Sequence, residues 1–229
     1  MIRDASTAPG WYGKLSSLGD FASRRLEPAW IESCDEWLAR SMTASRVQLG
    51  GNWLQTYLSA PVWRFAWAPG VADHRWWFGV LMPSCDNVGR YFPLIVAQPR
   101  DRPPLDRIGL DHLDLWWAHV ARAAVQTLQD HVSLDDFEAE LMGAPPWPTS
   151  RAVAAVTTAA SADRVRIQVE QGSSLVDVAG AWASQEMMAR LSGNTLWWPL
   201  ANGRASGAMT VSTGLPEVAR FTDLLTGHW

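Results

Sequence analysis

The stretch WFGVLMPSCDNVGRYFPLIVA, residues 77–97, decides the fold of this chain. Its first part, Trp77 to Met82, is a continuous apolar run without polar alternation, which is the pattern of a strand covered on both faces. A second apolar run, Leu94 to Ala97, is aliphatic and β-branched, and Pro93 before it is tolerated at the first residue of a strand. We therefore expect two strands, the first of them at the centre of a sheet.

The residues between the two runs are typical of a loop. Pro83 has no backbone N–H to donate to a sheet ladder. Four turn-forming residues follow it: Ser84, Asp86, Asn87 and Gly89. We expect a loop from Pro83 to Arg90 at the end of the central strand, followed by a hairpin-like return of the chain.

The glycine-rich segment GWYGKLSSLGDFASRRL, residues 10–26, follows a small, polar and loose end from Met1 to Pro9. A phosphate-binding loop would need Gly, four residues and then Gly-Lys-Ser/Thr. Here Gly10 and Gly13 are three apart and Leu15 stands where the hydroxyl should be. The segment is therefore expected to be a glycine-assisted loop that leads into a helix.

The rest of the chain alternates helical and strand patterns. Apolar residues at intervals of three and four predict helices, and short apolar or alternating runs predict strands. The expected helices cover residues 28–45, 52–58, 106–132, a segment capped by Ser133, 176–191 and 216–225. The expected strands cover residues 62–68, 165–169, 196–200 and 208–212, the last two around a turn at Asn202-Gly203. The acidic residues Asp135, Asp136, Glu138 and Glu140 are expected to be a solvated helical start and not a metal site.

Strands interleaved with helices of this length predict an α/β fold, a three-layer α/β/α sandwich with helices on both faces of one central sheet. The hairpin-like returns at 82–94 and 200–208 favour a mixed sheet over a purely parallel one. We expect a single domain over residues 1–229, because no interdomain linker interrupts the chain.

Composition restricts the function. The chain is 48% hydrophobic and 18% charged, which is a globular composition. Its net charge of −4 argues against a nucleic-acid partner, and no window approaches the roughly 20 apolar residues of a membrane span. Two distant thiols, Cys34 and Cys85, in a chain without an apolar N-terminal signal favour a reducing cytoplasm. The fifteen tryptophans are expected to form a bulky core.

The residues leave one catalytic alternative open. Cys85 follows a strand, where α/β enzymes often place nucleophiles, and it could act with His74 or His112 in a cysteine-dependent hydrolase or transferase. The alternative is that Cys85 is a small buried hydrophobe. Cys34 and Cys85 lack a C-x-x-C spacing, and His112 and His119 would be about 10 Å apart along a helix. We expect no metal and no cofactor.

Four cations form a group of interest: Lys14, Arg24, Arg25 and Arg90. If the glycine-rich segment packs near the loop from Pro83 to Arg90, they would form a cationic patch suited to a carboxylate or a phosphorylated partner. The alternative is that they pair locally with acidic residues, namely Asp20, Asp86 and Glu27.

Several stretches together resemble the TagF (ImpM) family of type VI secretion-associated proteins. They are GWYGKLSSLGDFASRRL at 10–26, WIESCDEWL at 30–38, FGVLMPSCDNVGRYFPLIVA at 78–97 and TLWWPL at 195–200. Ser16 departs from the family pattern, which has proline at that position.

The resemblance implies a cytoplasmic, non-enzymatic regulator that represses assembly or firing of the secretion apparatus after translation. It implies a forkhead-associated-domain scaffold protein as the partner. The family-signature positions are Gly13, Lys14, Gly19, Asp20, Phe21, Arg24, Arg25, Pro83, Ser84, Asp86, Gly89, Arg90 and Tyr91. Our hypothesis is that the four cations supply the polar part of the partner surface and that the glycines shape the two loops.

Overall fold

A seven-stranded sheet organises the computed structural model, which describes residues 8–104, 107–147, 157–161, 164–168, 171–172, 174–200 and 208–229. The strands are β1 (Gly10–Gly13), β2 (Ala22–Arg24), β3 (Trp63–Trp67), β4 (Trp76–Met82), β5 (Leu94–Arg100), β8 (Asn194–Pro199) and β9 (Thr210–Thr213). Their order across the sheet is β2-β1-β5-β4-β3-β8-β9. A separate hairpin pairs β6 (Thr157–Ser161) with β7 (Arg164–Gln168).

The mixed α/β class is confirmed, but the expected mixed sheet is wrong in strand direction. All the neighbouring strands described in this sheet are antiparallel. The connection from β3 to β4 and that from β4 to β5 are loops without a crossover helix, and parallel neighbours would need such a crossover. The shortness of these two connections, residues 68–75 and 83–93, therefore indicates antiparallel pairing of β3 with β4 and of β4 with β5.

β4 is the middle strand of the seven, as the apolar run predicts. All seven of its residues are buried. Phe78 and Val80 point into one hydrophobic cluster and Trp77 and Leu81 into another, so each face of the strand has its own core.

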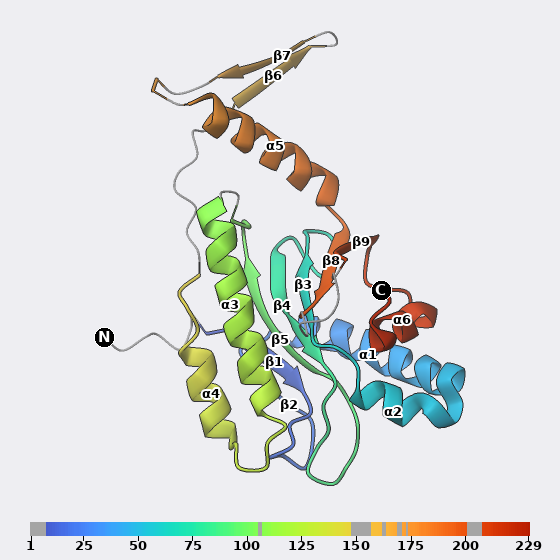
Figure 1. Cartoon of the computed structure of the whole chain (residues 1–229). Helices are drawn as coiled ribbons and strands as arrows, with labels where there is room; N and C mark the ends of the chain where they lie inside the picture. The colour runs from blue at the N-terminus through green and yellow to red at the C-terminus, as the bar shows by residue number, and fades with distance from the viewer. Residues whose placement is uncertain are drawn as a thin grey trace.

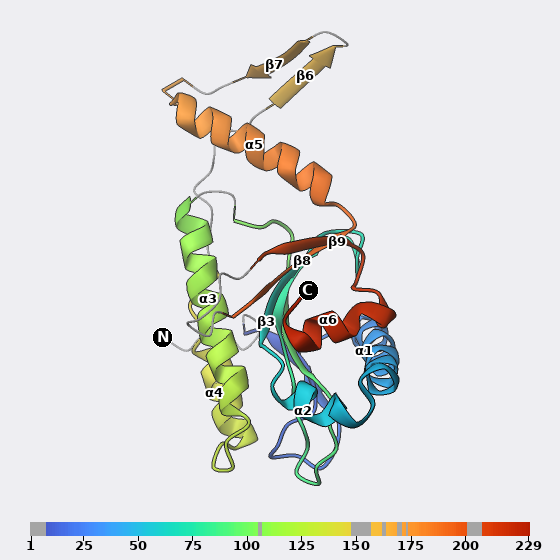
Figure 2. The ribbon, with the colours of Figure 1, turned by 45° about the vertical axis from the view of Figure 1, so that its right-hand side comes forward.

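Helices cover both faces of the sheet (Figures 1 and 2). α3 (Arg107–Gln126) and α4 (Leu134–Met142) contribute to the cluster on one face, and α1 (Pro28–Leu49), α2 (Trp53–Leu58) and α6 (Phe221–Thr226) to the other. Short 3-10 turns, Gly50–Asn52 and Val218–Arg220, precede α2 and α6. α5 (Leu175–Leu191) rises from the sheet toward the β6–β7 hairpin.

The helix starts agree with the caps that the sequence provides. Ser133 and Asp136 form the reciprocal hydrogen bonds of a capping box at α4, as Ser133 predicts. α1 begins at Pro28 but continues beyond residue 45 to Leu49. The turn expected at Asn202-Gly203 and the end of the strand expected at Val169 lie outside the described residues.

The segment from 10 to 26 is not the expected loop, because it contains the β1–β2 hairpin. Trp11 belongs to one core cluster and Tyr12 to the other, so their side chains alternate across a buried strand. Gly13 has φ +134°, and a Cβ there would lie 2.1 Å from the carbonyl oxygen of Pro93. Glycine in the segment from 10 to 26 therefore permits close packing of neighbouring strands and does not indicate a loop.

Most of the tryptophans are buried, as a bulky core requires. Several indoles also tie elements together. Trp37 donates to the Pro216 carbonyl at 2.8 Å and Trp63 to the Leu224 carbonyl at 2.9 Å, which fastens the C-terminal segment to α1 and β3. Within the described residues, the model contains no helix that combines the length and apolarity needed to traverse a bilayer.

A methyl group added at the centre of β4 should destabilise the fold. The Cβ of Gly79→Ala would lie 2.1 Å from the Val96 carbonyl oxygen and 2.5 Å from the Phe65 ring. We expect a loss of about 3 kcal/mol in the free energy of unfolding in urea, because overpacking forces backbone and ring to move. Gly51→Ala is the matched control, since its Cβ meets nothing within 4 Å. Equal stability of the two variants would contradict the packing described here.

Candidate partner-binding site

Two segments that are distant in the sequence meet at one end of the sheet. Ser84 Oγ donates to the Lys14 carbonyl at 2.8 Å, and the Asn87 N–H donates to the Leu18 carbonyl at 3.0 Å. Arg90 Nη2 donates to the Gly19 carbonyl at 2.5 Å. The expected proximity of the glycine-rich segment and the loop after the central strand is therefore confirmed. We call residues 14–24 and 83–92 together the loop pair.

Asp86 is the centre of the loop pair. Its Oδ2 lies 2.7 Å from Lys14 Nζ and 2.7 Å from Arg90 Nε. Its Oδ1 accepts the backbone N–H groups of Val88 at 3.1 Å and Arg90 at 2.8 Å. One carboxylate thus holds its own loop in shape and fastens it to the glycine-rich segment.

The surroundings of Asp86 favour its charged form. Its side chain is fully buried, and burial alone would raise the pKa of Asp86. The hydrogen bonds from Lys14, the Arg90 backbone, the Arg90 side chain and Val88 outweigh that effect and hold the pKa well below its ordinary value. The carboxylate is therefore ionised over the physiological range.

The four cations do not form the open cationic patch that one of our two interpretations predicts. Lys14 is buried and paired with Asp86, and Arg90 pairs with Asp86 and lies 4.0 Å from Asp20. Local pairing, the other interpretation, is confirmed for these two cations. Glu27 instead contacts Arg75 at 3.0 Å.

Glu138 of α4 is the acidic partner that sequence reasoning missed. It is only 5% exposed, so it is not part of the solvated helical start that we expected. Arg25 binds it through Nη1 at 2.6 Å and Nη2 at 3.2 Å, and the Trp11 indole also donates to it. Burial alone would raise the pKa of Glu138, but the hydrogen bonds from Arg25 and Trp11 lower it below its ordinary value. The sequence did contain an indication of this burial. Phe137 and Leu141 are apolar, four residues apart and adjacent to Glu138 on the buried side of α4.

The two neighbouring arginines have different surroundings. Arg25 adopts a left-handed φ of 59°, and its Nε donates to the Pro9 carbonyl at 3.0 Å while its guanidinium binds Glu138. Arg24 lies 3.7 Å from Glu138 and its side chain is 46% exposed. Arg25 therefore fastens the β1–β2 hairpin to α4, whereas Arg24 faces solvent.

Phe21 is an exposed aromatic side chain on a packed support. It is 44% exposed. Its ring stacks on Tyr12 at 6.0 Å and meets Phe92 edge-on at 4.8 Å, and Lys14 Nζ lies 4.3 Å from the ring centroid. Three buried groups thus fix the orientation of a ring whose outer side contacts solvent.

The other signature positions shape the loop pair or its base. Gly89 has φ +79°, and a Cβ on Gly19 would approach Asn87 to 3.3 Å. The Ser84 backbone N–H donates to the Tyr57 hydroxyl, which donates to the Ser84 carbonyl, both at 2.9 Å. Tyr91 lies edge-on to Trp53 and Tyr57.

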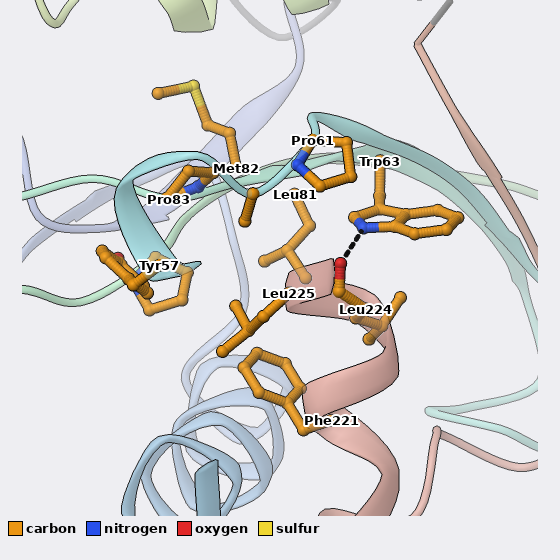
Figure 3. Close-up of a pocket in the computed structure, with 11 residues that line it drawn as sticks. Tyr57, Pro61, Trp63, Leu81, Met82, Pro83, Phe221, Leu224 and Leu225 are labelled. Atoms are coloured by element: carbon orange, nitrogen blue, oxygen red, sulfur yellow. Dashed lines mark hydrogen bonds between the residues drawn. The ribbon is translucent and has the colours of Figure 1, made fainter. Parts of the chain in front are cut away.

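An apolar cavity lies near the base of the loop pair, between α2, α6 and β4 (Figure 3). Tyr57, Pro83 and Phe221 are among its lining residues, and its volume of about 20 Å³ suits roughly one water molecule. The figure also shows the hydrogen bond from Trp63 to the Leu224 carbonyl at its wall. A cavity of this size and lining cannot hold a substrate.

Cys85 has the opposite environment to an activated nucleophile. Burial, and then the nearby Asp86 carboxylate, raise the pKa of the Cys85 thiol, whereas a nucleophile needs the thiolate. His74 precedes β4 and Cys85 follows it, so they are roughly 20 Å apart at 3.3 Å per residue. His74 is therefore too far from Cys85 to act as its base.

Among the described residues, no group of three or more His, Cys, Asp or Glu side chains is placed so that it could hold a metal ion. The arrangement at the loop pair is one of buried, mutually paired charges below a partly exposed surface.

Comparison with known proteins identifies relatives of this chain. Residues 10–144 match the model of the TagF N-terminal domain, type VI secretion system-associated. The crystal structure of PA0076 from Pseudomonas aeruginosa PAO1 is similar, with 34% sequence identity and a TM-score of 0.76 over 96% of this chain and 94% of that chain. No curated protein matches the sequence.

Replacing Asp86 should cost stability in a pH-dependent way. Because the folded pKa lies below the unfolded value, the ionised carboxylate stabilises the fold above the ordinary value of 3.8 and loses that effect as the pH falls. We expect Asp86→Asn to be clearly less stable than the parent protein in urea at pH 7, with a difference that shrinks between pH 4 and pH 3. A difference that stays constant over this range would show that the charge of Asp86 is not what stabilises the loop pair.

The two arginines before Leu26 should differ in their effect on stability. Arg25→Ala leaves the buried Glu138 carboxylate with the Trp11 indole and one more distant cation, Arg24. We expect a loss of about 2 kcal/mol in the free energy of unfolding, less than for a fully buried pair because Arg25 is partly exposed. Arg24→Ala is the matched control and should cost less than about 0.5 kcal/mol. Urea unfolding of both variants provides the measurement, and the reverse order would refute the assignment of Arg25 as the structural residue.

Proposed function

The chain belongs to the TagF family of type VI secretion system-associated proteins, and from that premise we propose that it represses assembly or firing of the secretion apparatus after translation. It does so without catalysis, in the cytoplasm, by binding a forkhead-associated-domain scaffold protein, the partner expected for the TagF (ImpM) family. The loop pair is the surface that binds this partner. We propose partner binding and not catalysis for two reasons. The loop pair presents a surface to solvent, and the pKa of its one thiol, Cys85, is raised, which disfavours the reactive thiolate.

The observation that carries the proposal is the supported, partly exposed ring of Phe21. Protein interfaces depend on a few aromatic or arginine anchors that enter a pocket of the partner. A ring held by Tyr12, Phe92 and Lys14 loses little conformational freedom on binding, so more of its contact energy contributes to affinity. Phe21 therefore has the exposure and the rigidity of an anchor.

Residues of suitable character surround the anchor. Val88 is 68% exposed, and the side chains of Asp20 and Arg90 are 82% and 55% exposed. Arg24 is also partly exposed, but it lies opposite Trp11 and beside Glu138 on the α4 side of the hairpin, whereas Phe21 packs on Tyr12 on the other side. An apolar centre with a mixed-charge rim is the usual composition of a protein interface.

The buried signature residues act indirectly in this proposal. Lys14, Ser84 and Asp86 are each 3% exposed, so a partner meets the surface that they hold in place and not these side chains. The hypothesis that all four cations contact the partner is therefore narrowed to Arg90, because the exposed Arg24 lies on the α4 side of the hairpin. Lys14 and Arg25 are positioning residues.

Truncation of the anchor should weaken binding without unfolding the protein. We expect Phe21→Ala to raise the Kd for the scaffold protein about 30-fold, the effect of a 2 kcal/mol hot spot. Leu115→Ala on α3 is the matched control, because Leu115 is 60% exposed and lies twelve residues, or roughly 18 Å along the helix, before Thr127, which contacts the loop pair. Isothermal titration calorimetry measures both, and circular dichroism confirms that each variant is folded.

Two results would contradict the proposal. Absence of binding by the parent protein would exclude the scaffold protein as partner. Equal affinity of the parent protein and Phe21→Ala would show that the partner binds another surface.

A further inference from the structure

The exposed ring of Phe21 takes its orientation from two buried rings. Phe21 and Tyr12 of β1 stack nearly parallel, with an interplanar angle of 14° and centroids 6.0 Å apart. Phe92 meets both of them edge-on, at 6.2 Å from Tyr12 and 4.8 Å from Phe21. Tyr12 and Phe92 are each only 7% exposed. A change in the direction of the Tyr12 ring would therefore reach Phe21.

The hydroxyl of Tyr12 reaches beyond this stack to α1, where it donates a hydrogen bond to the Asp35 carboxylate. Burial, and then the hydrogen bond with Asp35, raise the pKa of the Tyr12 hydroxyl above its ordinary value. The hydroxyl therefore keeps its proton at physiological pH and remains the donor. An ionised acceptor makes this hydrogen bond stronger than one between neutral groups.

We propose that Asp35 is a positioning residue for Phe21 and acts on it through Tyr12. The hydroxyl lies at the far end of the Tyr12 ring, so a hydrogen bond there fixes the direction in which the ring points. Phe21 stacks on the face of that ring and is fixed with it. This role rests on the function proposed for the loop pair, since Phe21 needs a fixed orientation only if a partner binds it.

α1 does not need this hydrogen bond to stay on the sheet. Trp30, Trp37 and Leu38 bury the apolar face of the helix in the core cluster that it shares with β3 and β4. Asp35 is half-buried and so lies at the margin of that face. The hydrogen bond from Tyr12 thus adds little to the packing of α1, and its main consequence is at the ring that supports the anchor.

Isothermal titration calorimetry with the forkhead-associated-domain scaffold protein measures the consequence for binding. Tyr12→Phe keeps the ring and its stacking but removes the hydroxyl, and Asp35→Ala removes the acceptor. We expect each to raise the Kd about fivefold, the effect of losing one hydrogen bond. The variant with both changes should bind no more weakly than either, because both remove the same interaction. Asp35→Asn retains an acceptor oxygen and should keep most of the affinity.

Glu36→Ala is the matched control. Glu36 follows Asp35 in α1, its side chain is 71% exposed, and it lies 3.6 Å from Arg40. Its replacement removes the same negative charge as Asp35→Ala but leaves the hydrogen bond of Tyr12 in place, so the Kd should equal that of the parent protein. Urea unfolding completes the comparison, because a purely structural role for Asp35 would lower the stability of Asp35→Ala and leave its Kd unchanged.

NMR of the free protein tests the positioning without a partner. NOEs between the ring protons of Phe21 and Phe92 should be strong in the parent protein, Glu36→Ala and Asp35→Asn, and weaker in Asp35→Ala and Tyr12→Phe. Unchanged NOEs in Asp35→Ala overturn the inference, whatever the partner does. Weakened NOEs with an unchanged Kd overturn it as well. In that case a raised Kd for Phe21→Ala leaves the proposed function standing without Asp35, and an unchanged Kd for Phe21→Ala removes both.

Discussion

The ionised carboxylate of Asp86 is the constraint on which the candidate site depends. A buried charge is tolerated only when its remaining lone pairs are satisfied, and Asp86 meets this condition with two cations and two backbone N–H groups. Each of those four donors removes a degree of freedom from a loop. Residues 83–92 contain glycine and an exposed valine, so they would have little reason to hold one conformation without this carboxylate.

The sheet beneath the loop pair explains why the two loops meet at all. β1 pairs with β5, and β4 pairs with β5 on its other side, so the segment after β1 and the loop between β4 and β5 leave the sheet at the same end. Large aromatic side chains on both faces of β4 make this arrangement rigid. The loop pair therefore continues directly from the buried strands β1, β4 and β5.

The sequence predicted the central strand, the loop after it and most helices because each depends on local pattern. Trp77 to Met82 has no polar residue, and Ser133 with Asp136 is a capping signal within four positions. It did not predict β1, since glycine weakens a strand unless a neighbouring backbone approaches as closely as that of Pro93, which is a tertiary contact. It did not predict the partner of Arg25, because Glu138 is 113 residues away and looks in sequence like any other acidic residue on a helix.

Several of the residues that carry the family signature in this sequence are not ones that a partner can contact. Lys14, Ser84 and Asp86 are buried, and Arg25 is fixed to α4, so their chemistry is used within the protein. Phe21 is different, because it contacts the buried Lys14 on one side and solvent on the other. A change in the buried charges would thus reach a partner through the orientation of this ring, which couples the stability of the loop pair to recognition. In the function that we propose, a rigid surface of this kind would bind its partner without rearrangement, and its specificity would lie in the shape that Asp86 maintains.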